Sequence, residues 1–247
     1  MTIGNHEFQW PGLWPLLLTL ALLSLLIGLG FWQLGRAEFK ASLHEAFAAP
    51  GPMRDFRDVL DDFPNGPPQR FQRAVATGRF GDVPGFLLDN RTHEGRVGYH
   101  ALAPFRLQGG REWVLVNLGW VPQGATRRDL PQLTWPEGPQ QLPVLVSFPP
   151  EKTLVFGDEE PLRPGYPIVL QALRLESFAA HLGAPLLDFV LLLDASAPFG
   201  YQRQWKPYYG ITPDKHRAYA FQWFSLALAL LLIFLTVNTR KRSATDG

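Results

Sequence analysis

The chain of 247 residues contains no cysteine. This absence excludes disulfide bonds, cysteine nucleophiles, iron–sulfur clusters and thiolate metal sites. Net charge is also nearly absent, because 23 Lys and Arg residues against 22 Asp and Glu residues leave a charge of +1. That balance argues against electrostatic binding of nucleic acid. A hydrophobic content of 46% argues against an intrinsically disordered chain, so the averages describe an ordinary protein of one or two domains.

Common catalytic motifs are missing as well. The sequence has no HExxH, GxSxG, Walker or GxGxxG pattern, and therefore offers no case for a soluble hydrolase or transferase. His93 and His100 lie seven residues apart across a turn, which would permit a metal pair. Single histidines at such a spacing are more often surface or packing residues. We expect a protein that is not an enzyme.

The charges are unevenly distributed, and a long segment near the N-terminus has none. No charged side chain lies between Glu7 and Arg36, a stretch of 28 residues whose dense apolar part is residues 16–32. A bilayer-spanning helix needs roughly 20 such residues. Nothing basic precedes the apolar run and no small-residue cleavage site follows it, which disfavours a signal peptide. The segment predicts an uncleaved transmembrane helix at residues 13–34.

A second charge-free segment lies near the C-terminus. It runs for 22 residues from Ala218 to Thr239 and precedes the basic cluster Arg240-Lys241-Arg242. The segment predicts a second transmembrane helix at residues 216–238, followed by a basic tail at residues 239–247. The chain is therefore expected to be a multi-pass membrane protein.

The flanking charges predict the topology. The C-terminal basic cluster should remain cytoplasmic, so two spans put both termini in the cytoplasm and the central domain, residues 36–212, outside. Arg36 and Lys40 favour the opposite orientation, but they count for less because a large domain translocates largely regardless of its charge. No Arg-rich presequence suggests mitochondrial import. The simplest placement is a bacterial inner membrane with a periplasmic domain.

The segment between the helices predicts a small, mainly antiparallel β domain with one or two helices, an α+β fold. Gln108-Gly109-Gly110 separates two apolar segments and indicates a hairpin, because glycine supplies the positive φ of a tight turn. Residues 175–182, followed by Gly183, predict a short helix. The predicted strands are residues 71–80, 86–88, 97–107, 113–120, 142–148, 168–173 and 186–193.

The start of the second helix carries a distinctive set of residues. Thr212-Pro213-Asp214 predicts the helix N-terminus, since Thr accepts a backbone N–H, Pro is tolerated at the first position and Asp suits the positive helix end. His216 then falls in the first turn. Tyr219 and Trp223 share its face of the helix.

The end of the first helix carries a matching set. Gln33, Arg36 and Lys40 share one face by the same spacing, and Trp32 lies beside them. The predicted topology places this set and the set around His216 at the same outer membrane surface. The two sets are therefore able to meet.

Two interpretations of these sets remain open. Trp and Tyr commonly anchor at the headgroup level, and Arg and Lys bind lipid phosphates there. His216 differs in kind, because a neutral imidazole at the mouth of a helix pair is a good axial ligand for haem iron. Nearby aromatic side chains would then cover the macrocycle, and Arg36 and Lys40 would pair with its propionates. The residues alone favour an interfacial belt.

Several short motifs occur in a specific order along the chain. Residues 30–36 read GFWQLGR, with Lys40 following, and residues 76–80 read ATGRF. Residues 98–122 contain GYH, PF and VLVNLGWVP, and residues 216–224 contain the His, Tyr, Ala, Trp and Phe of the second helix. In this order, and with two terminal spans around an exported domain, they resemble the Surfeit locus protein 1 family over nearly the whole chain.

The resemblance implies a membrane factor for cytochrome c oxidase assembly. Members of that family are implicated in delivering haem a to oxidase subunit I or stabilising it there, which implies haem a as a transient cofactor. The implied partners are the lipid bilayer, oxidase subunit I and haem a synthase, with no nucleic acid. His216 matches the family's haem ligand, so it is the expected axial ligand of the iron. The other expected haem-binding residues are Tyr219, Trp223, Trp32, Gln33, Arg36 and Lys40.

An alternative from a different class is a membrane scaffold. It would stabilise an oxidase assembly intermediate by protein contacts and bind no haem. One departure from the family pattern is Leu118, where the family usually has Arg, so any role that needs a cation there is in doubt. Ser24 with Gly28, and Ser225 with Ala229, have small-xxx-small spacing and predict close helix packing.

Overall fold

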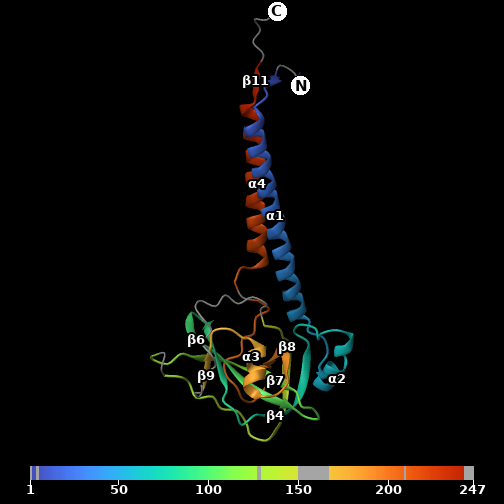
Figure 1. Cartoon of the computed structure of the whole chain (residues 1–247), viewed down its shortest axis with the longest axis vertical. Helices are drawn as coiled ribbons and strands as arrows, with labels where there is room; N and C mark the ends of the chain where they lie inside the picture. Colours follow the sequence, from blue (N-terminus) through green and yellow to red (C-terminus); the bar gives the residue numbers. More distant parts are fainter. Residues whose placement is uncertain (1, 4–5, 127–128, 150–166, 209, 242–247) are drawn as a thin grey trace, which may run out of the picture. The chain divides into compact units, whose positions relative to one another are not determined.

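The structure is a computed structural model that describes residues 2–3, 6–126, 129–149, 167–208 and 210–241 (Figure 1). The chain divides into a helical unit, Met1–Glu45 with Pro207–Gly247, and a β unit, Ala46–Lys206. Two of the predicted segments lie partly outside the described residues. They are the central domain, at residues 127–128, 150–166 and 209, and the expected cytoplasmic tail, at residues 242–247.

Two long helices dominate the helical unit. Helix α1 is Leu13–Ala48 and helix α4 is Pro213–Val237, and both are long and apolar enough to cross a membrane. Helix α1 does not end at the predicted boundary near residue 34 but continues through Arg36 and Lys40 to Ala48. Its 36 residues extend over about 54 Å, well beyond the roughly 30 Å of a hydrocarbon core. The additional turns are the polar part of the helix, and from Arg36 to Ala48 they contain good helix formers and no glycine or proline.

The two helices run side by side (Figure 1) and pack along a regular seam. The buried and half-buried positions of each helix recur at alternating spacings of three and four residues, the period of a left-handed coiled coil. On α1 these positions are Leu23, Leu26, Gly30, Gln33, Ala37 and Lys40. On α4 they are His216, Ala220, Trp223, Ala227, Leu230 and Phe234. A polar patch, Gln33, Lys40 and His216, therefore occupies one end of an otherwise apolar seam.

The helices pack tightly at Gly30. A Cβ at this position would lie 2.5 Å from Cε1 of Phe224, so only glycine leaves room for the ring. The same ring also packs edge-on against Phe31, with centroids 5.4 Å apart. The predicted small-residue contacts are wrong, because Ser24, Gly28, Ser225 and Ala229 are all exposed. They share the correct spacing but lie on faces that turn away from the seam.

A short three-stranded sheet joins the chain ends. Its strands are β1 Thr2–Ile3, β2 His6–Phe8 and β11 Thr239–Lys241, in the order β1-β2-β11. All pairings in it are antiparallel. The sequence does not predict this sheet, because strands of two or three residues are too short to show an alternation of apolar and polar residues.

In its described residues the β unit contains an eight-stranded sheet and three short helices. Its strands are β3 Arg54–Asp55, β4 Arg73–Phe80, β5 Phe86–His93, β6 Arg96–Leu107, β7 Trp113–Pro122, β8 Pro139–Ser147, β9 Ile168–Leu170 and β10 Leu186–Leu193. Its helices are α2 Phe56–Asp61, the 3-10 helix η1 Phe63–Asn65 and α3 Leu175–Leu182. Helix α3 and the hairpin between β6 and β7 agree with the sequence prediction. Strand β3, helix α2 and η1 were not predicted.

The central part of this sheet closes on itself. The strands follow the order β4-β8-β10-β7-β6, and β4 then pairs with β6, which completes a five-stranded barrel. Closure depends on Gly78, where a Cβ would lie 2.1 Å from the backbone oxygen of Arg106. The prediction of a mainly antiparallel domain needs one refinement, because β10–β7, β3–β4 and β5–β9 are parallel pairs. The sheet is therefore mixed.

Two apolar cores hold the β unit together. Alternate residues of the barrel strands fill the interior, including Val114, Val116 and Leu118 of β7. Helix α2 adds Phe56, whose ring contacts Phe189 with centroids 6.0 Å apart. The second core lies on the other face of the strands, where Leu115 and its neighbours are covered by α3 through Phe178. Strand β7 is thus buried on both faces, which explains its nearly continuous apolar sequence.

Candidate functional site

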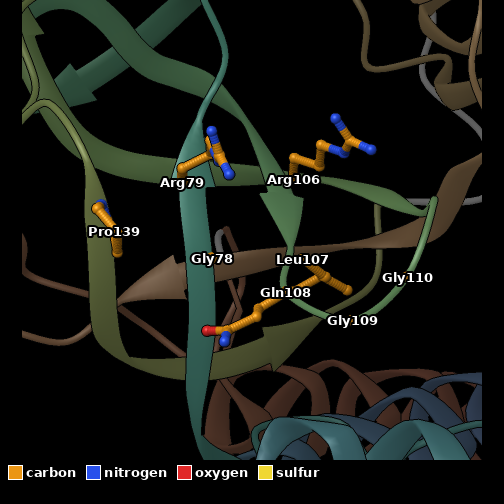
Figure 2. A pocket seen from close by; sticks show the side chains of 8 residues that line it. All are labelled: Gly78, Arg79, Arg106, Leu107, Gln108, Gly109, Gly110 and Pro139. Atoms are coloured by element: carbon orange, nitrogen blue, oxygen red, sulfur yellow. The ribbon is translucent and has the colours of Figure 1, made fainter.

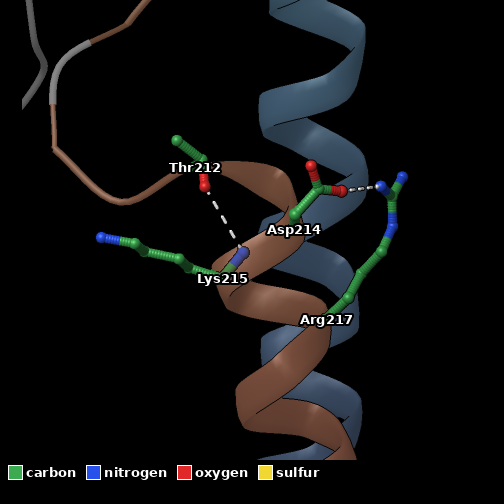
Figure 3. Close-up of polar contacts among 4 residues, drawn as sticks. All are labelled: Thr212, Asp214, Lys215 and Arg217. Atoms are coloured by element: carbon green, nitrogen blue, oxygen red, sulfur yellow. Dashed lines mark hydrogen bonds and ion pairs between the residues drawn. The ribbon is translucent and has the colours of Figure 1, made fainter.

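The N-terminus of α4 is capped as the sequence predicts. Oγ1 of Thr212 accepts the backbone N–H of Lys215 at 3.4 Å, and Pro213 occupies the first helical position. Asp214 pairs with Arg217 one turn later at 2.8 Å (Figure 3). These contacts begin the helix at a defined residue, and so they fix the turn from which His216 projects.

His216 lies in the seam between the two helices and is only 6% exposed. Its Nδ1 is 2.6 Å from Oε1 of Gln33 on α1. A carboxamide oxygen can only accept, so Nδ1 of His216 carries the hydrogen and donates it. The structure thus brings together one member of each residue set that the sequence placed at the outer ends of the helices.

This hydrogen bond selects a tautomer. In a neutral imidazole one nitrogen carries the hydrogen and the other carries the lone pair. With Nδ1–H committed to Gln33, the lone pair of His216 resides on Nε2. Metal-bound histidines characteristically donate their second nitrogen to a carbonyl or carboxylate in this way. The donor chemistry of His216 therefore fits an axial ligand of haem iron.

The basic residues near His216 are placed differently from one another. Lys40 is only 9% exposed, and its Nζ lies 4.4 Å from the ring centroid of Tyr208. Arg36 is exposed, with its guanidinium 5.5 Å from the ring of Phe39. Lys40 is thus enclosed by protein, whereas Arg36 is open to an anionic group such as a propionate. No sequence motif pointed to Tyr208, because it lies outside both helices.

The aromatic members of the two sets are mostly open. Trp32 is 58% exposed and Tyr219 is 41% exposed, while Trp223 is half-buried in the seam. Exposed Trp and Tyr at the polar end of an apolar helix pair are typical of an interfacial belt. Open aromatic faces at the same place are also available to a planar ligand.

Of the two histidines of the β unit, His93 and His100, His100 differs from His216 in its hydrogen bonding. Oδ1 of Asn117 accepts the backbone N–H of Gly119 at 3.1 Å, so Nδ2 of Asn117 donates to Nδ1 of His100 at 3.2 Å. The hydrogen of His100 is therefore on Nε2, the opposite tautomer to that of His216. Burial, aided by the charges of Arg91 and His93, lowers the pKa of His100 to about 4.

The surroundings of His93 and His100 are those of packing residues. The ring of His93 packs on Trp120 with centroids 5.2 Å apart, and that of His100 meets Trp205 edge-on at 5.7 Å. Within the described part of the chain, no group of three or more His, Asp or Glu side chains is arranged to hold a metal ion. The structure thus gives His100 a packing role in the β unit, with its Nδ1 lone pair engaged by Asn117.

Comparison with known proteins assigns the chain to a family. The model of the SURF1 family matches residues 20–228, which include the barrel, most of the seam and both members of the His216–Gln33 pair. The chain belongs to the SURF1 family. This agrees with the resemblance carried by the sequence motifs, and the match extends from within the first long helix into the second.

Relatives within the family are distant but cover the chain. A SURF1-like protein of Rickettsia bellii (strain RML369-C) is 27% identical over 224 residues, which is 85% of each chain. One of Rickettsia conorii (strain ATCC VR-613 / Malish 7) is 25% identical over 240 residues, or 90% of each chain. A SURF1-like protein of Caenorhabditis elegans is 23% identical over 261 residues, covering 94% of this chain and 76% of its own.

The departure from the SURF1 pattern at Leu118 has a structural setting. Leu118 is fully buried in the barrel interior, where an apolar side chain satisfies the packing and a charged one would need a buried partner. The next residue, Gly119, has φ of 120° and approaches the backbone of Gln202. In this SURF1 chain the side chain at position 118 packs in the apolar interior of the barrel.

Proposed function

We propose that this SURF1 family member is a non-enzymatic assembly factor for haem-copper cytochrome c oxidase in a bacterial inner membrane. It holds haem a transiently and presents it to oxidase subunit I, with haem a synthase as the source. The observation that supports this best is the hydrogen bond between Gln33 and Nδ1 of His216, which leaves Nε2 of His216 able to bind iron. The bound haem supplies the redox-active iron that the oxidase requires.

Each residue of the site has a defined task in this proposal. Gln33 orients the imidazole of His216 and holds its hydrogen on Nδ1. Arg36, which is exposed at the same end of the helix pair, pairs with a propionate. Trp32 and Tyr219 provide apolar contact at the lipid boundary. Lys40 is enclosed beside Tyr208, so we assign it to holding the helix end in place and not to the propionates.

The burial of His216 bears on reversibility. Because only 6% of the residue is exposed, binding of a macrocycle to Nε2 requires the side chains around His216 to move aside. The free energy of that movement weakens the apparent affinity for haem. Weak and reversible binding is what a factor that releases its cargo needs. The proposed orientation has the β unit in the periplasm and both termini in the cytoplasm, as the basic cluster at residues 240–242 favours.

A second function is favoured by the same burial. His216 and Gln33 are also able to act as a polar clamp that fixes the register of two apolar helices, as a single buried polar residue does in coiled coils. The protein would then be a scaffold that stabilises an oxidase intermediate through protein contacts and carries no haem.

The absorption spectrum of the detergent-purified full chain tests the proposal. Protein from cells that make haem a should show a haem band, and protein from cells without haem a synthesis should not. His216→Ala should abolish the band, and Gln33→Leu should reduce haem loading by about tenfold or more, since it removes only the orienting acceptor. His44→Ala is the control, because His44 is exposed on α1.

The outcomes separate the two functions. A haem band at wild-type stoichiometry in His216→Ala would refute the ligand assignment. Wild-type protein that carries no haem but co-purifies with oxidase subunit I would favour the scaffold. Circular dichroism of each variant should retain the wild-type helix content, which shows that a lost band reflects lost binding.

A further inference from the structure

The point at which the barrel closes carries an unusual pair of charges. Strands β4 and β6 pair antiparallel there, and Arg79 lies directly opposite Arg106. Gly78 permits this approach, since any Cβ would collide with the backbone of Arg106. Directly opposed residues place their Cβ atoms roughly 5 Å apart on the same face. Closure of the barrel thus places the two arginines next to each other on one face of the strand pair.

Two like charges in this arrangement destabilise the strand pair unless something compensates them. Both side chains are exposed, and no carboxylate of the described residues lies within ion-pair distance of either. Another arginine of the same unit, the partly exposed Arg54, does have a partner, since its guanidinium is 2.8 Å from Asp62. Within the described part of the chain, Arg79 and Arg106 therefore lack an internal counter-charge.

The two arginines line an open cavity of about 320 Å³ (Figure 2). The opposite wall is the turn between β6 and β7, at Gln108, Gly109 and Gly110, and none of the lining residues is acidic. Figure 2 shows the Gln108 carboxamide extending toward β4, on the other side of the cavity from the two guanidinium groups. The cavity thus combines two positive charges, a neutral amide and a backbone turn without side chains.

The turn is held in place from outside the cavity. Nη2 of Arg57 on α2 donates to the backbone oxygen of Gln108, and the N–H of Gln108 donates to the backbone oxygen of Thr77 at 2.9 Å. These contacts fix the wall that faces the arginines. A cavity bounded by a strand pair and an anchored turn is largely preformed, which lowers the cost of binding.

We propose that Arg79 and Arg106 bind a phosphate group in this cavity. Each guanidinium presents a planar fork of N–H donors that matches two oxygens of a phosphate, and the two positive charges attract its negative charge. The group is carried either on a small soluble molecule or on the headgroup of an anionic phospholipid. The site is independent of the haem site proposed above.

Thermal unfolding of the full chain in neutral detergent tests the site. Addition of about 10 mM inorganic phosphate at constant ionic strength should raise the unfolding temperature of the wild-type protein. Arg79→Gln and Arg106→Gln should each weaken phosphate affinity by about tenfold or more. Arg111→Gln is the matched control, because Arg111 is exposed on the same hairpin but does not line the cavity.

A second readout distinguishes lost binding from lost folding. Relief of charge repulsion should leave the phosphate-free unfolding temperature of Arg79→Gln equal to or above that of the wild type. The combination of an undiminished baseline and a lost phosphate response supports the site. An equal phosphate response in wild type, Arg79→Gln and Arg111→Gln overturns it.

Vesicle flotation identifies the carrier of the phosphate. The full chain is reconstituted in phosphatidylcholine nanodiscs and mixed with vesicles of phosphatidylcholine with or without phosphatidylglycerol. Capture that depends on phosphatidylglycerol and on both arginines assigns the site to a lipid headgroup. Stabilisation by inorganic phosphate without such capture assigns it to a soluble phosphate. Neither response in the wild-type protein refutes the proposal.

Discussion

The stability of the β unit should depend on pH through His100. Burial first, and then the charges of Arg91 and His93, lower the pKa of His100 from 6.5 to about 4 in the folded protein. In the unfolded chain His100 is solvated and takes up a proton near pH 6.5. Between these two values the unfolded state binds more protons, so the free energy of unfolding falls as the pH falls.

The size of the effect follows from the shift in pKa. A difference of about 2.5 pKa units corresponds to roughly 3 kcal/mol of stability once the pH is below both values. Between pH 7.5 and 5, about 2 kcal/mol of this should already be lost, since protonation of the unfolded state accounts for most of it. That is a large part of the stability of a typical domain.

The pH dependence of the free energy of unfolding is measured by urea unfolding of the full chain in detergent, followed by tryptophan fluorescence. Trp120 and Trp205 contact the histidines and so report on the relevant region. The comparison is between the wild type and His100→Gln, because Gln still accepts a hydrogen bond from Asn117 and does not titrate. The quantity of interest is the free energy of unfolding of the wild type minus that of His100→Gln, in which the contributions of all other titrating groups cancel. This difference should fall by about 2 kcal/mol between pH 7.5 and 5.

The control is His44→Gln, which removes an exposed imidazole from α1 and should follow the wild-type curve. Parallel pH dependences for the wild type and His100→Gln would refute the reasoning. That result would mean that His100 is as well solvated when folded as when unfolded.

Two further variants test the packing. Arg203→Met should destabilise the β unit by about 3 kcal/mol in the same urea assay, because the Arg203 guanidinium donates to the backbone oxygens of Asp194 and Phe199 and the variant leaves these acceptors unpaired; a loss below about 1 kcal/mol would mean that water replaces the donor. Gly30→Leu should destabilise the helix pair by about 2 kcal/mol in thermal unfolding in nanodiscs, since the added atoms overlap Phe224. Gly28→Leu, which meets no heavy atom within 4 Å of its Cβ, should have no such effect, and equal effects of the two variants would argue against the seam.

Much of the secondary structure could be predicted from the sequence, because helix ends and turns depend on residues close together in the chain. Thr212 and Pro213 begin α4 where predicted, and Gly183 ends α3 as the residue that adopts φ of 61°. The hairpin at Gln108 to Gly110 follows from glycine in the same way. The family could also be recognised, since motif order and spacing survive at low sequence identity.

The contacts between segments far apart in the chain could not be predicted from the sequence. The face of each membrane helix that packs inward depends on its partner, so the correct spacing of Ser24 and Gly28 pointed to the wrong face, while Gly30 forms the close contact. The tautomers of His216 and His100 depend on acceptors and donors 183 and 17 residues away. Such interactions leave no periodic trace in a single sequence.

The sequence by itself therefore determined where the apolar helices lie, where most strands of the β unit lie and which family the protein resembles, because propensity, capping and hydrophobic period act over a few residues. Tertiary structure alone decided that β4 pairs with β6 to close a barrel, that this closure sets Arg79 opposite Arg106, and that Gln33 orients His216. These arrangements depend on which surfaces meet. That choice is made by packing over the whole unit and not by any single segment.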